Sequence, residues 1–355
     1  MKLTPEEHLV LLLSHPFPSE RALHAVAGLF AKTGGKSDPA EIDRLLALCQ
    51  TGPLLYRNIR QTPWNRDDRQ EQYKFTYIAH LSSAEARLRE TLAVLEGLGS
   101  NGIKAIPLKG PIAAELLLGD PGLYRSSDID LLVRPEDVEK ALASLAGQGY
   151  ARTSPLGLKD EMAGSYHTTV SKETFHIELH WNLVMRYFDA DPGFWWDDAQ
   201  ETDYRGRKIL QLSHEKFLLY LVFRLFSKGF LPLKFFILAL GIISNQNTAL
   251  DWDRFMRYAQ ELKMERLAIF TRDLVRDIFL MDIPGQFPHR SIFGHGLLKN
   301  MVLEGLFEPR INTHIRMALF LSLLDSPAAI LGALLRRLFP TPAEVRLRYT
   351  SPLAP

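Results

Sequence analysis

The sequence predicts an α+β protein in which a small mixed sheet is flanked by helical regions on both sides. Apolar residues recur at helical spacing in the first hundred residues and again after residue 213. Between these regions, short apolar runs alternate with helix-like segments, as in a layered α/β core. A chain of 355 residues is also long enough for two or three domains. We therefore expect a helical N-terminal region over residues 1–100, an α/β core over 101–212 and a helical C-terminal domain over 213–355.

The composition is that of an ordinary soluble globular protein, with 46% hydrophobic and 23% charged residues. The formal net charge is +1, so no overall field steers the chain toward nucleic acid or membranes. Cys49 is the only cysteine, which excludes internal disulfides and favours a reducing cytosol. The acidic N-terminus is unlike a signal peptide, and the most apolar stretch, 229–243, is too short to cross a bilayer. We expect a cytoplasmic protein without a membrane partner.

Helices are expected throughout the first hundred residues. Thr4 is placed to cap a helix that Pro5 opens, and the loop at 34–39 separates it from a further helix over about 40–50. An apolar stripe at helical spacing then predicts a long helix over 70–98. No residue pattern in this region indicates chemistry.

The polar chemistry of the chain gathers in the stretch Ile103–Val133. A short apolar run ends at Lys109 and Gly110, and Pro111 opens a helix-like segment. Proline at the first helical position, with the free N–H groups behind it, favours an anion site. Lys109 is well placed there to meet a triphosphate. Arg125, in the Gly/Pro-rich loop that follows, is either a second phosphate contact or a solvated surface arginine.

Two carboxylates begin the next apolar run. Asp128 and Asp130 lead directly into Leu131–Val133, and side chains two apart on a strand share a face. Side by side, these carboxylates would repel each other, raise at least one carboxyl pKa and need cations. Divalent metal is the natural answer, since paired Mg²⁺ ions hold phosphoryl groups in many enzymes. The alternative is a solvated strand end without metal.

The same Asp-x-Asp spacing occurs twice more. Asp189 and Asp191 precede Pro192-Gly193 and predict a turn, whereas Asp251 and Asp253 predict a helix cap. Neither pair leads into an apolar strand, so we assign metal binding to the first pair alone.

A helix over about 135–147 and a hairpin with strands 166–170 and 175–183 complete the expected core. The second strand alternates strictly, so that its apolar side chains face one way and its polar ones the other. The apolar set is Phe175, Ile177, Leu179 and Trp181, and the polar set is His176, Glu178 and His180. Further helices are expected over 213–222, 234–243, 252–262, 267–280 and 315–338.

These motifs resemble the polymerase-β-like nucleotidyltransferase superfamily, whose core strand carries Asp-x-Asp after a glycine-containing turn. The chain is more closely similar to bacterial uncharacterised nucleotidyltransferases, in which Leu-Lys-Gly replaces the usual Gly-Ser. The residues that carry this likeness are Leu108-Lys109-Gly110, Arg125, Asp128-Ile129-Asp130-Leu131-Leu132-Val133 and Glu178-Leu179-His180-Trp181. The likeness loosens after residue 213, where this chain has Phe223, Arg224 and Leu238 near positions that often hold His and Asp in the group.

The resemblance implies a metal-dependent nucleotidyltransferase built on such a core. Asp128, Asp130 and Glu178 would be the catalytic acids and would hold two Mg²⁺ (or Mn²⁺) ions, while Lys109, Gly110, Arg125 and His180 would bind the nucleotide. The enzyme would move a nucleoside monophosphate from an NTP, with ATP expected, to a hydroxyl of a small-molecule, peptide or protein acceptor. The near-zero net charge argues against a nucleic-acid acceptor.

Two alternatives remain at this point. One is a nucleotide- or peptide-binding protein that keeps the fold without turnover. The other is a zinc hydrolase, because His176, Glu178 and His180 on one strand face could direct three ligands at a single Zn²⁺ ion.

Overall fold

The computed structural model describes residues 3–66, 70–185, 188, 190–245, 248–285, 287–288, 291–307, 321–340 and 345. Its centre is a five-stranded mixed sheet with the strand order β1-β2-β5-β4-β3. The strands are β1 (Ala105–Pro107), β2 (Ile129–Val133), β3 (Ala151–Arg152), β4 (His167–Lys172) and β5 (Phe175–His180). Only β2 and β5 pair in parallel among these neighbours, and the other three pairings are antiparallel. The expected mixed sheet is confirmed.

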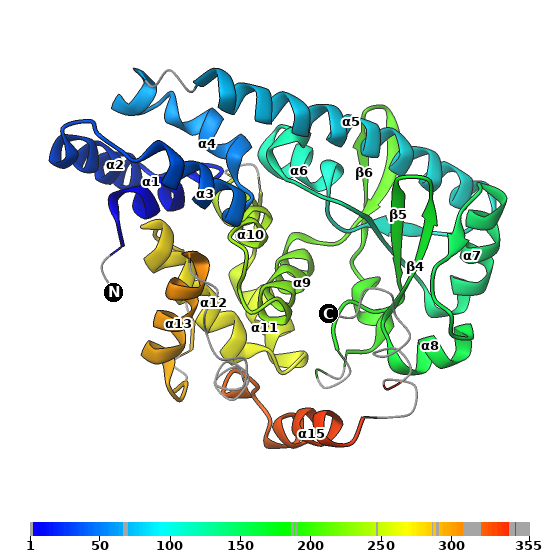
Figure 1. Ribbon diagram of the computed structural model, residues 1–355. Helices are drawn as coiled ribbons and strands as arrows, with labels where there is room; N and C mark the ends of the chain where they lie inside the picture. Colours follow the sequence, from blue (N-terminus) through cyan, green and yellow to red (C-terminus); the bar gives the residue numbers. More distant parts are fainter. Residues whose placement is uncertain are drawn as a thin grey trace.

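One face of the sheet is covered by two helices, α5 (Gln70–Ser100) and α7 (Val138–Gly147), with α8 (Leu158–Gly164) beside β4 (Figure 1). Alternate residues of β2 and β5, such as Leu131 and Leu179, are fully buried against these helices. The predicted alternation in the second hairpin strand is therefore correct. The opposite face of the same strands carries Asp130, Glu178 and His180 and is turned toward helices of the C-terminal region.

Helices from the two ends of the chain pack into one common hydrophobic core. The N-terminal set is α1 (Pro5–Leu13), α2 (Glu20–Thr33), α3 (Pro39–Cys49) and α4 (Gly52–Ile59). The C-terminal set is α9 (His214–Ser227), α10 (Lys234–Ser244), α11 (Trp252–Glu261), α12 (Glu265–Phe279), α13 (His295–Phe307) and α15 (Pro327–Leu338). Short 3₁₀ turns lie at η1 (Pro63–Arg66), η2 (Pro121–Leu123), η3 (Pro135–Asp137) and η5 (Pro192–Trp195).

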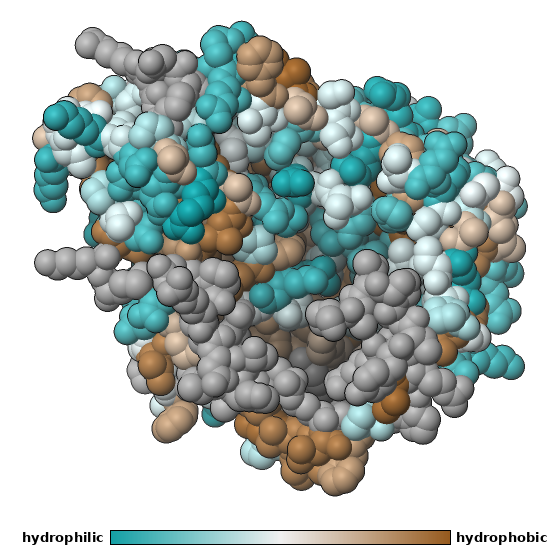
Figure 2. Space-filling model, viewed as in Figure 1, coloured by the Kyte–Doolittle hydropathy of each residue, from teal (hydrophilic) through white to brown (hydrophobic). Residues whose placement is uncertain are grey.

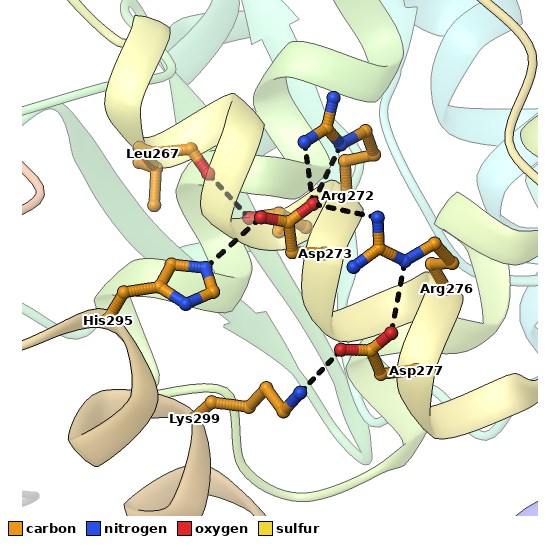
Figure 3. Close-up of polar contacts among 8 residues, drawn as sticks. Leu267, Arg272, Asp273, Arg276, Asp277, His295 and Lys299 are labelled. Carbon is orange, nitrogen blue, oxygen red and sulfur yellow. Dashed lines mark hydrogen bonds and ion pairs between the residues drawn. The ribbon is translucent and has the colours of Figure 1, made fainter. Parts of the chain in front are cut away.

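Caps and ion pairs fix several of these helices. Thr4 caps α1 in a reciprocal capping box with Glu7, as its position predicts. Two acids of α12, Asp273 and Asp277, pair with residues of α13 and also with arginines of α12 itself (Figure 3). The Asp273 carboxylate lies 3.1 Å from His295 Nε2, and Asp277 accepts from Lys299.

The structure departs from the expected elements in several places, and α13 and the short strand β3 both lie where no element was expected. A polar hairpin, β6 (Gln200–Tyr204) and β7 (Arg207–Gln211), forms a second small sheet where no strand was expected. Helix α8 was also missed. The expected helix over 315–338 is confirmed over Pro327–Leu338 (α15), but residues 322–326 are not helical and Ser326 caps the start of α15. Residues 308–320 lie outside the described residues.

Helix α15 leaves apolar side chains in solvent. Leu331 and Leu338 are 57% and 70% exposed, and the helix forms an apolar patch at the lower edge of the molecule (Figure 2). Among the described helices, none combines the length and hydropathy that a transmembrane span requires.

Candidate active site

The register of two parallel strands creates the site. Asp130 of β2 and Glu178 of β5 are direct partners across the central pairing, and His180 follows two residues later on β5. Side chains at these positions share one face of the sheet. One ligand atom from each of Asp130, Glu178 and His180 lies within 4.8 Å of the others. The structure thus brings Asp130 and Glu178 together, as the sequence predicts.

Asp130 is the most buried acid of the site, with 1% of its surface exposed. Its Oδ1 atom lies 2.8 Å from Lys109 Nζ and 3.2 Å from His180 Nε2. Its Oδ2 atom is buried and has no hydrogen-bond partner among the described residues. A buried carboxylate oxygen without a partner is costly unless a ligand completes its coordination.

Lys109 supplies the cation that the acid pair needs. The backbone N–H of Leu108 donates to the carbonyl of Asp130 at 3.0 Å, which carries Lys109 to the side of β2. Its ammonium lies 2.8 Å from Asp130 and 3.8 Å from Asp128 Oδ2, and only 8% of its side chain is exposed. Burial acts to lower the pKa of Lys109, but the charges of Asp130, Tyr220 and Asp128 together outweigh it and raise that pKa.

The expected raising of a carboxyl pKa is wrong for Glu178. Burial acts to raise the pKa of Glu178, but the hydrogen bond and charge of His180, 3.3 Å away, lower it well below its usual range. His180 responds in the opposite sense. Burial acts to lower its pKa, and its bonds to Asp130 and Glu178 raise it. The site therefore compensates its carboxylates with Lys109 and His180 rather than leaving them to repel one another.

His167 faces His180 from the neighbouring strand β4, with ring centroids 5.1 Å apart. Burial, followed by the charge of His180, lowers the pKa of His167 to about 4. The folded protein therefore holds His167 neutral, while the unfolded chain takes up a proton near pH 6.5. His167 therefore leaves the free energy of unfolding unchanged above pH 6.5 and lowers it as the pH falls from 6.5 toward 4.

We therefore expect His167→Gln to flatten the acid side of the stability profile. Between pH 6.5 and 5, the free energy of unfolding of the wild type should fall relative to that of the variant. The difference should approach about 1.4 kcal/mol per pH unit. Urea unfolding across this range measures it, and His24→Gln, on the exposed side of α2, is the control. Parallel profiles for wild type and His167→Gln would show that His167 is protonated in the fold.

Gly110 is the N-cap of α6 (Pro111–Leu118), and no side chain caps this helix. Its φ of 82° lies in the region that favours glycine. A Cβ here would have ordinary contact with Ser126, so the backbone conformation, not space, demands glycine. The free N–H groups of α6 thus begin next to Lys109, as the anion-site expectation requires.

Three residues singled out from the sequence lie outside the cluster of Asp130, Glu178 and His180. Asp128 precedes β2, is half-exposed and accepts from Ser127 Oγ at 3.2 Å, so it stands outside the Asp130–Glu178–His180 group. Arg125 is exposed. His176 is exposed on the hairpin and its Nδ1 lies 2.7 Å from Ser171 Oγ. Among the described residues, the ligand group therefore contains Asp130 in place of the His176 that a zinc strand would use.

No sequence pattern assigned a residue of α9 to the site, but the structure brings Arg224 close to it. Arg224 interrupts an otherwise apolar run of this helix, and its charge interacts with Asp130 and Glu178. A lone arginine within a buried apolar helix face is the signal that could have found it, because such a charge needs a partner or ligand.

The donor set fits a divalent metal ion. Two carboxylates and an imidazole converge, and the partnerless Asp130 Oδ2 is a ready ligand atom. Carboxylate oxygens suit Mg²⁺ or Mn²⁺, and an imidazole is a common ligand of Zn²⁺ and other transition metals. The set lies beside the uncapped N-terminus of α6, which is a favourable place for an anion such as phosphate.

Comparison with known proteins identifies the protein family of the chain. The chain belongs to the family of uncharacterised nucleotidyltransferases, whose sequence model matches residues 35–279. A search of curated proteins gave no match. Among solved structures, the chain is similar to the antibiotic-resistance factor ANT(2″)-Ia, with 15% identity and a TM-score of 0.35 over 55% of this chain and 96% of that one. A TM-score this low does not demonstrate a shared fold.

Proposed function

We propose that the protein is a metal-dependent nucleotidyltransferase that moves a nucleoside monophosphate from an NTP, ATP in the first instance, to a hydroxyl-bearing acceptor. The acceptor is a small molecule, a peptide or a protein. The observation that carries the proposal is the convergence of Asp130, Glu178 and His180 within 4.8 Å, beside the free N-terminus of α6. Membership of the nucleotidyltransferase family supports it. The lone Cys49 suits a cytosolic enzyme.

Each residue has a role that follows from its position. Asp130, Glu178 and His180 hold the metal, with Asp128 completing the acidic set. A bound Mg²⁺ or Mn²⁺ ion would neutralise phosphate charge and lower the pKa of the acceptor hydroxyl. Lys109 and the N–H groups behind Gly110 bind the triphosphate. Glu178 is the central acid that an acceptor hydroxyl can reach, because its side chain is 24% exposed whereas that of Asp130 is 0% exposed, so Glu178 is placed to take the acceptor proton.

The direct test is transfer itself. Each labelled NTP is incubated with Mg²⁺ or Mn²⁺ and candidate acceptors, including the protein's own hydroxyls. We expect release of pyrophosphate and a gain of one nucleoside monophosphate in the mass of the acceptor. Nucleotide binding without pyrophosphate release under any of these conditions would instead support the non-catalytic alternative. The Lys109 ammonium already on Asp130 is the observation that favours that alternative.

Metal binding should be visible as stabilisation. At a Mg²⁺ concentration about 100 times Kd, the free energy of unfolding should rise by about 2.7 kcal/mol. Glu178→Gln should lose most of this gain, because it removes a charged ligand. Asp253→Asn should keep it, since Asp253 has the same Asp-x-Asp spacing but lies exposed on α11. Melting curves with and without metal decide, and an unchanged Mg²⁺ response in Glu178→Gln would remove Glu178 from the site. Stoichiometric zinc in the purified protein would contradict the magnesium assignment.

A further inference from the structure

Helices α6 and α10 pack on each other near their C-terminal ends. The C-terminal end of α6 packs on the C-terminal half of α10, since a Cβ on Gly241 would lie 3.2 Å from Leu117 Cβ. Asn245, just after α10, donates to the carbonyl of Leu117 at 3.0 Å. Seven residues before these contacts, about 10 Å along each axis, α6 begins at Gly110 and α10 at Lys234. Side-chain caps are absent at both starts.

Lys234, the first residue of α10, lies near Lys109. The electrostatic neighbours of its ammonium agree with this placement, because they include Asp128, Lys109 and Arg125. Burial and the neighbouring cations lower the pKa of Lys234 to about 8, although Asp128 acts to raise it. A lysine in this state is a cation that its surroundings do not fully compensate.

Helix α9 adds two more cations on one face. Arg224 lies in the last turn of α9, and Lys228, four residues later, is the C-cap of this helix, so the two follow each other along one side of its end. Phe223, next to Arg224, packs on Tyr166 at the start of β4 with ring centroids 6.4 Å apart, which holds this part of α9 against the sheet. The Nε atom of Arg224 is buried and has no hydrogen-bond partner among the described residues.

The acids of the site already form ion pairs with Lys109 and His180. The ion pairs that described residues form here join Lys109 and His180 to Asp128, Asp130 and Glu178. Within the described part of the chain, no such pair involves Arg224, Lys228 or Lys234, and cations outnumber carboxylates around the site. A metal ion on the acids would increase this excess. With a divalent ion bound, the excess would exceed the charge of about −2 that a phosphomonoester carries, so a polyanion is the ligand that would balance it.

We propose that the C-terminal helical region forms the pyrophosphate half of the nucleotide site, in which Lys228 of α9 and Lys234 of α10 bind the β- and γ-phosphates. Arg224, whose charge interacts with Asp130 and Glu178, contacts the same phosphates. This inference rests on the proposed function and names the group that these helices bind. During transfer, the acceptor oxygen bonds to the α-phosphorus, the bond from that phosphorus to the β-bridging oxygen breaks, and the acceptor proton passes to Glu178. The three cations stabilise the charge that leaves with pyrophosphate.

The test compares ligands that contain or lack the β- and γ-phosphates. Binding of inorganic pyrophosphate, ATP and AMP to the full chain with Mg²⁺ is measured by calorimetry. Lys228→Gln and Lys234→Gln should each weaken pyrophosphate and ATP binding about 10-fold or more, which is the usual effect of losing a hydrogen bond to a charged group. AMP binding should stay within about 2-fold of wild type. Lys140→Gln, exposed on α7 across the sheet, is the matched control.

A charge-conserving variant tests the role of the buried Arg224. Arg224→Lys should fold and should keep more pyrophosphate affinity than Arg224→Gln, since the ammonium keeps the charge but not the planar fork. Equal pyrophosphate affinity in wild type, Lys228→Gln and Lys234→Gln would overturn the inference. An equal loss for AMP and ATP would also overturn it, because the cations would then bind the α-phosphate or the acceptor.

The two proposals fail separately. Wild-type protein that transfers nucleotides while the lysine variants match it would sink the inference and leave the proposed function intact. Wild-type protein that binds pyrophosphate through Lys228 and Lys234 but transfers nothing would keep the polyanion site and remove the catalytic proposal.

Discussion

Asp130→Asn is expected to lower nucleotidyl transfer by about 10²–10³-fold, the scale on which a lost transition-state charge contact acts. The substitution removes the negative charge of the most buried acid and replaces one of its carboxylate oxygens with an amide group. A metal ion bound by Asp130, Glu178 and His180 would lose a charged ligand, and with it the neutralisation of the triphosphate. Turnover at saturating NTP and metal measures the effect. Asp253→Asn, exposed on α11, is expected to retain full activity.

The same variant separates catalysis from folding. From the sequence alone, two repelling carboxylates predict that Asp130→Asn stabilises the metal-free protein. The structure reverses this sign, because Asp130 compensates two buried cations, Lys109 and His180. We now expect the free energy of unfolding without metal to fall by about 3–5 kcal/mol, as when one partner of a buried ion pair is removed. Activity within tenfold of wild type would contradict the proposed metal site, whatever the change in stability.

The sequence predicts the centre of the site because that part depends on local pattern. Asp130 begins an apolar strand and Glu178 alternates with buried Ile177 and Leu179, so each side chain has its face assigned by the two-residue period. The remaining step is that β2 and β5 pair in parallel, which the alternation of strands and helices favours. The helix start behind Gly110 follows from proline and glycine chemistry.

Features that depend on long-range packing could not be predicted from the sequence. The direction of the Lys109 ammonium is decided by its burial against Asp130, which no local pattern encodes. The packing of α10 on α6, which brings Lys234 to the site, depends on Gly241 far along the chain.

The missed β6–β7 hairpin is a different case. Its strands are mostly polar and exposed, so the period-2 signal is weak. The turn at Arg205 and Gly206, both with positive φ, is the local signal that could have revealed it.

Lys109→Met is the second variant for which we expect a large effect. A lysine at a strand end ordinarily packs only its stem, so the sequence predicts a loss of NTP affinity with little change in the fold. In the structure the ammonium itself is buried and lies 2.8 Å from Asp130. Methionine keeps the stem but leaves the Asp130 carboxylate with His180 as its remaining cation. We expect the free energy of unfolding without metal to fall by about 3–5 kcal/mol.

Metal should then rescue Lys109→Met, because a divalent ion on Asp130 replaces the missing positive charge. Urea unfolding with and without Mg²⁺ should show a larger metal-dependent gain in stability for Lys109→Met than for the wild type, in which the ammonium competes for the same carboxylate. NTP titrations in Mg²⁺ should still show affinity weakened by about 1.5–3 kcal/mol, since the triphosphate loses a charge-assisted contact. Lys140→Met, on the opposite side of the sheet, is the control for lost surface charge. A metal-free Lys109→Met protein as stable as wild type would mean that the buried ion pair contributes nothing to the fold, and unchanged NTP affinity would remove Lys109 from the nucleotide site.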